Sequence, residues 1–135
     1  MIKRQTGQAL VEFTFIFLIF IMLVYGIAEG GRLIYDYGVV SQATREGVRY
    51  ASVRGSTCKI PGGSSCTATE TAIKNYVVGK SVGLLTPAKV AVSWPGGSNA
   101  PGKSVAIQTT YAFQSQMWFI PSVTLRSQSQ MVIIH

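Results

Sequence analysis

Hydrophobic and polar residues are divided very unevenly along this chain of 135 residues. An almost continuous apolar run covers residues 13–28 and contains no charged side chain. Together with residues 9–11, it approaches the roughly 20 apolar residues that a helix needs to cross a bilayer. Lys3 and Arg4 precede the run, so the positive-inside rule predicts a cytoplasmic N-terminus and export of the chain that follows the run.

A second helical pattern follows the apolar run. Its hydrophobic positions recur at spacings of three and four, and they are Leu33, Tyr37, Val40, Thr44, Val48 and Ala51. The polar residues expected off this stripe are Asp36, Gln42, Arg45, Glu46 and Arg49. The two patterns predict one helix from about Gln8 to Arg54, apolar on all sides in its first half and amphipathic in its second. The Gly30-Gly31 pair is the predicted place for a bend or local melting.

The remainder of the chain predicts a short helix and a small sheet. Thr67 and Glu70 match the [ST]-x-x-E capping box, ahead of the apolar residues Ile73, Tyr76 and Val77. Three segments alternate as strands do, and the residues expected on their apolar faces are Val90, Val92 and Trp94, then Val105, Ile107, Thr109, Tyr111 and Phe113, then Val123, Leu125, Met131 and Ile133. The stripe on the long helix can cover these faces, which predicts an α+β head with roughly three antiparallel strands.

Two cysteines, Cys58 and Cys66, flank a flexible turn in the part of the chain predicted to be exported. An oxidising compartment favours a disulfide between them, with a chain-entropy stabilisation of about 2.5 kcal/mol for so short a loop. A zinc site would need two more ligands, and the single histidine is the last residue, His135. We therefore predict a disulfide, with no metal and no cofactor.

The formal net charge of +7 is a weaker clue. Arg45 and Arg49 share one helix face and Arg54 follows, which would suit a docking surface for nucleic acid or anionic lipid. A solvated helix face on an exported protein explains them more simply, because no basic strip with interleaved aromatics and no groove-reading motif is present. A nucleic-acid partner is not expected. Trp94, Trp118 and Phe119 also suggest an adhesive tip, although the alternation assigns Trp94 to the sheet.

The residues around the start of the apolar run carry the most specific signal. A glycine, Gly7, is followed by Gln8, with Glu12 at the fifth position after the glycine and Phe13 at the sixth. This arrangement resembles a type IV prepilin processing site, with cleavage between Gly7 and Gln8. The cut would create an α-ammonium at Gln8, about 6 Å along the helix axis from Glu12. In a packed neighbour, the carboxylate and the ammonium could neutralise each other and set the axial register.

The similarity extends beyond this site. Three blocks in order, at residues 7–13, 26–32 and 43–51, resemble the TadE-like family of the tight-adherence (Tad, Flp-type) pilus system. The resemblance covers about residues 4–52, and it departs from the family in lacking an early proline and in having Gly30 where an aromatic residue is frequent. It implies a type IV pilin-like fold and a minor pilin or pseudopilin, without catalytic activity.

The resemblance also implies partners and a location. A prepilin peptidase would process the chain at Gly7 and Gln8, and Glu12 and Phe13 would serve assembly. Other pilin-like subunits would pack against the helix with the help of a Tad-type inner-membrane machine. The precursor would lie in the bacterial inner membrane with its head in the periplasm or outside, and the mature subunit in an extracellular filament. Adhesion, protein secretion and DNA uptake all remain open as the role of this filament.

Together, the residue pattern and the resemblance predict an organisation in four parts. Residues 1–7 form a leader peptide, 8–28 a transmembrane and assembly helix, 29–54 its amphipathic continuation, and 55–135 a small α+β head with the Cys58–Cys66 loop.

Two other functions remain open. Gly26 and Ala28 are small residues spaced as a signal peptidase prefers, so cleavage after Ala28 would release a soluble binding protein. The chain could also stay uncleaved as a single-span anchored protein. An enzyme is not predicted, since the sequence offers neither a nucleophilic triad nor a phosphate-binding glycine loop, and Glu70 is the only acidic residue after position 46.

Overall fold

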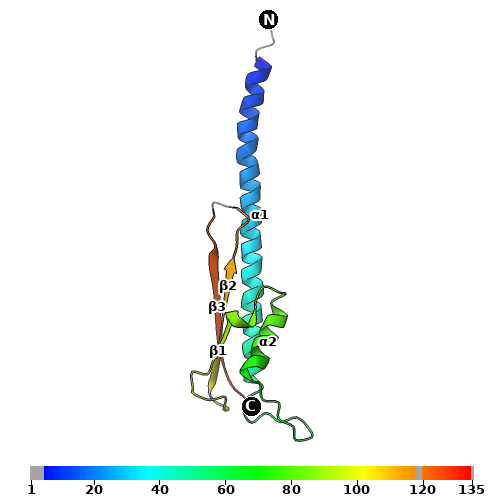
Figure 1. Cartoon of the computed structure of the whole chain (residues 1–135), viewed down its shortest axis with the longest axis vertical. Coiled ribbons are helices and arrows are strands. Elements are labelled where there is room, and N and C mark those ends of the chain that lie inside the picture. The colour runs from blue at the N-terminus through cyan, green and yellow to red at the C-terminus, as the bar shows by residue number, and fades with distance from the viewer. Residues whose placement is uncertain (1–4, 118–119, 135) are drawn as a thin grey trace. The chain divides into compact units, whose positions relative to one another are not determined.

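The computed structural model describes residues 5–117 and 120–134, so Trp118 and Phe119 lie outside the described residues. Its elements in chain order are helix α1 (Gln5–Ser52), helix α2 (Glu70–Lys80), the 3-10 helix η1 (Pro87–Lys89), and strands β1 (Val90–Ser93), β2 (Ser104–Phe113) and β3 (Val123–Val132) (Figure 1). The predicted α+β class, with a long N-terminal helix, a short helix and a three-stranded antiparallel sheet, is confirmed.

Two compact units divide the chain, Met1–Ile34 and Tyr35–His135. The first contains α1 as far as Ile34, and the second contains the remaining turns of α1 with all the other elements. Helix α1 continues through Gly30 and Gly31, so the local melting predicted at this pair is not observed.

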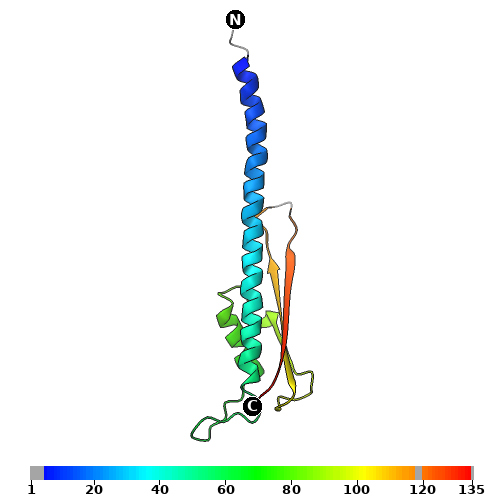
Figure 2. The same cartoon turned by 180° about the vertical axis from the view of Figure 1, so that it is seen from behind.

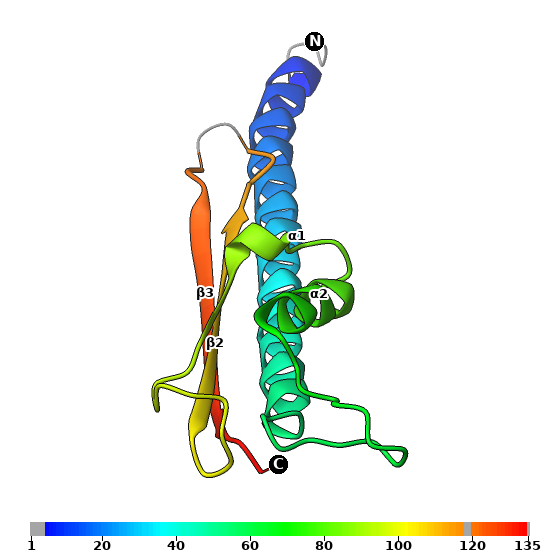
Figure 3. The same cartoon turned by 60° about the horizontal axis from the view of Figure 1, so that its bottom comes forward.

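The sheet of the second unit is a simple meander with the order β1-β2-β3. Strand β2 pairs antiparallel with both neighbours, and its pairing with β3 is continuous from Ser104 opposite Val132 to Phe113 opposite Val123. The predicted apolar face of β2 is confirmed by the burial of Val105, Ile107, Thr109 and Phe113. Helix α2 and the turns of α1 after Tyr35 lie on this same face of the sheet (Figures 2 and 3). The opposite face is left open.

The buried stripe of α1 was predicted correctly at four of its six positions, and of the other two Leu33 is partly buried. Val40, Thr44, Val48 and Ala51 are buried, as their spacing indicated. Tyr37 is instead 46% exposed, and Asp36, which the polar pattern assigned to solvent, is only 5% exposed. The spacing of four from Val40 leads back to Asp36, and a partner in the sheet described below makes the burial of its carboxylate possible.

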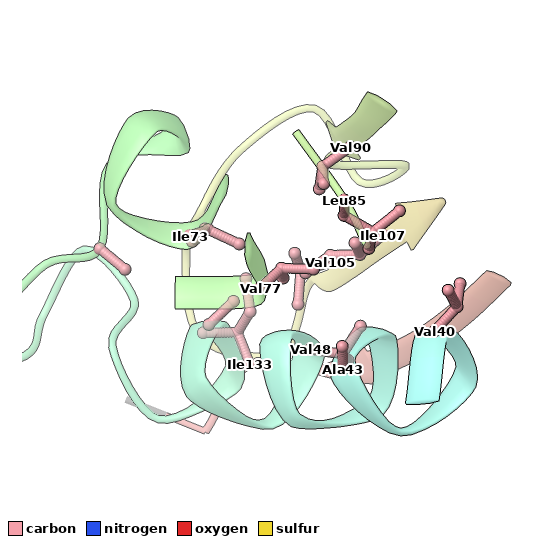
Figure 4. Close-up of a cluster of buried hydrophobic side chains, with 12 residues drawn as sticks. Val40, Ala43, Val48, Ile73, Val77, Leu85, Val90, Val105, Ile107 and Ile133 are labelled. Carbon is pink, nitrogen blue, oxygen red and sulfur yellow. The ribbon is translucent and has the colours of Figure 1, made fainter. Parts of the chain in front are cut away.

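The core joins the two helices to the sheet. Val105 and Ile107 lie between the α1 side chains Ala43 and Val48 and residues of the α2–β1 region (Figure 4). The other residues of this buried cluster are Val40, Ala51, Ala68, Ile73, Val77, Leu85, Val90 and Ile133. Trp94 packs against the cluster just after β1, in agreement with its place in the alternating pattern.

Helix α2 begins two residues later than the capping box suggested. Thr69 is its N-cap, with extended backbone and a side-chain oxygen that accepts a hydrogen bond from the Ala72 N–H at 3.2 Å. Thr67, the predicted cap, instead donates its hydroxyl to the Gly55 carbonyl at 3.2 Å. Glu70 is the first helical residue and pairs with Lys74 one turn later at 2.6 Å. The cap prediction was therefore wrong by two positions, since this part of the chain has three closely spaced threonines.

Candidate functional site

The four residues predicted for processing and assembly all lie in α1 within the first unit. Gly7 and Gln8 lie near the start of the helix, and Glu12 and Phe13 follow one turn later. All four are exposed, and Phe13, at 62%, stacks on Phe17 with ring centroids 5.8 Å apart. Because Gln8 and Glu12 are four residues apart in a helix, they share one face.

The surface of α1 around these residues is hydrophobic on all sides. In the stretch from Leu10 to Ile27, each large hydrophobic residue exposes between 43% and 68% of its area. The Gly7–Ser52 part of α1 includes an 18-residue window with a mean hydropathy of 2.5, none of it buried, so it is long and apolar enough to cross a membrane. Thr14, a polar residue in this stretch, donates its hydroxyl to the Leu10 carbonyl at 2.8 Å. The helix therefore satisfies this hydroxyl internally, as a low-dielectric environment requires.

Charged residues return where the apolar stretch ends. Glu29 and Arg32 form an ion pair at 3.6 Å on consecutive turns of α1. An ion pair at this position is compatible with the level of a membrane–water interface, at the end opposite to Glu12.

The two cysteines form the predicted disulfide. Cys58 and Cys66 are bonded, with Cα atoms 5.2 Å apart. Inside the loop, Lys59 and Ser65 pair through an isolated antiparallel β-bridge. The turn between them uses Gly62 and Gly63 at positive φ, which glycine adopts without steric cost. The bond closes an exposed loop of the second unit.

Two polar side-chain pairs between α1 and the sheet were missed by sequence reasoning. The Tyr111 hydroxyl donates a hydrogen bond to an Asp36 carboxylate oxygen at 3.2 Å. Two turns further along α1, the hydroxyls of Thr44 and Thr109 are 2.7 Å apart in a fully buried contact. Both pairs join α1 to β2. The signal in the sequence was the four-residue spacing Asp36, Val40, Thr44, which continues the buried stripe.

Replacing Tyr111 with Phe should lower the free energy of unfolding of the full chain in detergent by about 1–3 kcal/mol, because the buried Asp36 carboxylate loses a donor. Tryptophan fluorescence during urea unfolding measures this. Tyr37→Phe, at a half-exposed position of α1, is the matched control and should change stability by less than about 0.5 kcal/mol. Equal effects of the two substitutions would show that the Asp36–Tyr111 contact contributes nothing.

A second cluster joins α1 to α2 through aromatic rings. Tyr50 and Tyr76 stack with centroids 4.3 Å apart, and the Arg54 guanidinium carbon lies 4.1 Å from the centroid of the Tyr50 ring. Lys80 lies over the other ring at 5.5 Å. Arg54 therefore has a packing role, whereas Arg45 and Arg49 are exposed on α1. Among residues 5–117 and 120–134, no group of three metal-ligating side chains gathers.

These features define a class of protein. A long, exposed, apolar N-terminal helix whose last turns pack on a small α+β unit is the architecture of a pilin-like subunit. Residues 7–49 match the family model described as TadE-like protein, and this range includes all four predicted processing and assembly residues. The resemblance to the TadE-like family is thus confirmed over this part of the chain, which fits a pilin-like subunit of the Tad pilus system. No curated protein and no solved structure matches the chain.

Proposed function

We propose that the chain is a TadE-like prepilin, cut between Gly7 and Gln8 by a prepilin peptidase and assembled through α1 into a pilus or secretion pseudopilus. The single observation that carries the proposal is the exposed apolar surface of α1 between Leu10 and Ile27, with one carboxylate at its start. Such a surface requires cover, which lipid provides before assembly and neighbouring helices provide afterwards.

The chemistry at the start of the helix supports assembly. Removing residues 1–7 would give Gln8 an ammonium group, and Glu12 lies one turn away on the same helix face. Inside a bundle of apolar helices, both charges are costly unless each meets an opposite charge. The carboxylate of one subunit therefore pairs with the ammonium of its neighbour, and this pairing fixes how far one helix slides along the next.

The geometry around Gly7 supports processing. A side chain added at Gly7 would meet no atom within 4 Å, so the glycine is not needed for packing within the chain. Glycine weakens a helix by about 1 kcal/mol relative to alanine, which eases the opening of this first turn for a peptidase. The lack of a side chain also lets the backbone approach the catalytic groups of the peptidase closely.

The signal-peptide and uncleaved-anchor alternatives predict different N-termini. Cleavage after Ala28 would divide the matched region 7–49 and leave its first block without a role. The continuous family match across this position therefore favours the pilin assignment over a secreted binding protein.

N-terminal sequencing of the mature protein, combined with its intact mass, tests the proposal. A start at Gln8 is expected, and Gly7→Leu should leave the chain folded but uncut, since position 7 has open space. A start at Glu29 would establish the secreted protein, and a start at Met1 in cells with an active prepilin peptidase would establish the plain anchor. Either result would overturn processing at Gly7.

A further inference from the structure

The sheet has an outer face that neither helix covers. The pairing register places twelve side chains on this outer face: Ala91, Ser93, Ser104, Ala106, Gln108, Thr110, Ala112, Thr124, Arg126, Gln128, Gln130 and Val132. On β2 they alternate with the residues that face the core, and among them Ala106 is only 5% exposed. Both helices lie on the other face of the sheet (Figure 3). The outer face is thus rich in hydroxyl and amide groups and free of aromatic and acidic side chains across the three described strands.

The charge on this side of the molecule is of one sign only. Glu70 is the last acidic residue of the sequence, so the entire sheet and its loops lack a carboxylate side chain. Arg126 on β3 and Lys89 at the end of η1 are both exposed, and no ion pair involves either within the described residues. An unneutralised positive field therefore lies over a surface of neutral hydrogen-bonding groups.

The two cations, Lys89 and Arg126, lie on either side of the polar residue Thr110. Thr110 lies directly opposite Arg126 in the β2–β3 pairing, and Thr110, Gln108 and Lys89 line the same shallow depression at β1 and β2. Neighbouring strands lie about 4.8 Å apart, which separates the backbones of β1 and β3 by about 10 Å. Lysine and arginine side chains can both reach inward over that distance. An anionic group above Thr110 would meet two cations, a hydroxyl and an amide.

We propose that this outer face binds an acidic polysaccharide. A carboxylate of the chain sits above Thr110 between Lys89 and Arg126, with hydrogen bonds from the Thr110 hydroxyl and the Gln108 amide. The sugar hydroxyls contact the neutral side chains beyond it, Gln128 and Gln130 among them. The proposal does not depend on cleavage at Gly7, because every residue that it uses lies in the second unit.

The same observations disfavour other anionic partners. Single-stranded nucleic acid is bound by stacking its bases on aromatic rings, and the outer face carries none. A duplex is read by a helix or a two-stranded ribbon that enters its groove, whereas this surface is the broad face of a three-stranded sheet. A membrane surface would call for large apolar side chains that insert, and Val132 is the only one present on the face. A hydroxyl-rich chain with regularly spaced carboxylates fits best.

Binding of the purified full chain in a neutral detergent to polygalacturonate tests the proposal, with dextran as the neutral polysaccharide. The double variant Lys89→Gln and Arg126→Gln should weaken binding about tenfold or more, since a hydrogen bond to a charged group contributes a factor of this order. Thr110→Val should weaken it severalfold. The matched control Lys59→Gln removes a cation of the disulfide loop, outside the sheet, and should change the affinity by less than about twofold.

Unfolding curves of all variants distinguish a loss of affinity from a loss of folding stability. Substitutions of exposed lysine and arginine should leave these curves unchanged. Equal binding of dextran and polygalacturonate would overturn the role of the two cations. Polyglutamate or single-stranded DNA binding as tightly as polygalacturonate, with the same loss in the double variant, would overturn the polysaccharide as ligand. An undiminished affinity in the double variant would overturn the site.

Discussion

Replacing Glu12 with Ala should leave the protein in the membrane and cleaved, yet almost absent from filaments. In the proposed assembly, the substitution would leave a neighbour's Gln8 ammonium without its carboxylate in an apolar environment, and breaking a buried charge pair costs about 3–5 kcal/mol per contact. This corresponds to a loss of at least about 100-fold in the affinity of one subunit contact. Quantitative immunoblotting of sheared filaments against membranes measures the incorporated fraction.

Three further variants test whether the negative charge of Glu12 is what filament incorporation requires. Glu12→Gln keeps the shape of the side chain and should fail as Ala does, whereas Glu12→Asp should retain part of the incorporation. Glu46→Ala removes an exposed acid from the second unit and should assemble normally. Filament yields equal to that of the unsubstituted protein in both Glu12→Ala and Glu12→Gln would remove the carboxylate from the assembly mechanism.

Replacing Gly47 with Val should unfold the second unit more readily, with a loss of about 1–3 kcal/mol or more. A Cβ at position 47 would overlap the Val77 side chain of α2 and lie 3.2 Å from the Ile107 methyl of β2. Val77 and Ile107 are fully buried, and Val77 is a stiff β-branched residue, so neither can move aside without disturbing the core. Urea unfolding followed by tryptophan fluorescence gives the free energy of unfolding.

Gly38→Ala is the matched control for this effect. Both glycines lie in α1 in the second unit, but a Cβ at Gly38 would have nothing within 4 Å. This control should stabilise the protein by about 0.5–1 kcal/mol, because alanine favours the helix. The opposite signs expected for the two positions distinguish close packing from helix propensity. A Gly47→Val protein as stable as Gly38→Ala would contradict the close contact between α1 and α2.

The elements themselves could be predicted from the sequence, because each carries its own period. The apolar run, the stripe of α1 and the alternation in β2 all specify a local conformation through their neighbours along the chain. The spacing of Cys58 and Cys66 specified a bond for the same reason, since only a short turn separates them.

The errors occur where a distant residue changes the local preference. Asp36 is buried because the Tyr111 hydroxyl, 75 positions away, reaches its carboxylate. Thr69 caps α2 in place of Thr67, whose hydroxyl is engaged by Gly55, 12 positions earlier. The role of Gly47 could not be found at all, because α2 and β2 approach it from other parts of the chain.

The candidate functional residues also fall into those that the sequence predicts and those that only the tertiary structure brings together. Gly7, Gln8, Glu12 and Phe13 could be named from the sequence, since their spacing within two helical turns is the signal itself. The outer face of the sheet needed the register of three strands, which alone brings Lys89 and Arg126 to either side of Thr110.

Sequence alone therefore determined the membrane-competent helix, the prepilin-like start and the α+β class, because these depend on residues a few positions apart. Tertiary structure decided which polar groups are buried, which glycine must stay small and which cations share a surface. Those properties depend on contacts between segments far apart in the chain, and a local pattern contains no information about them.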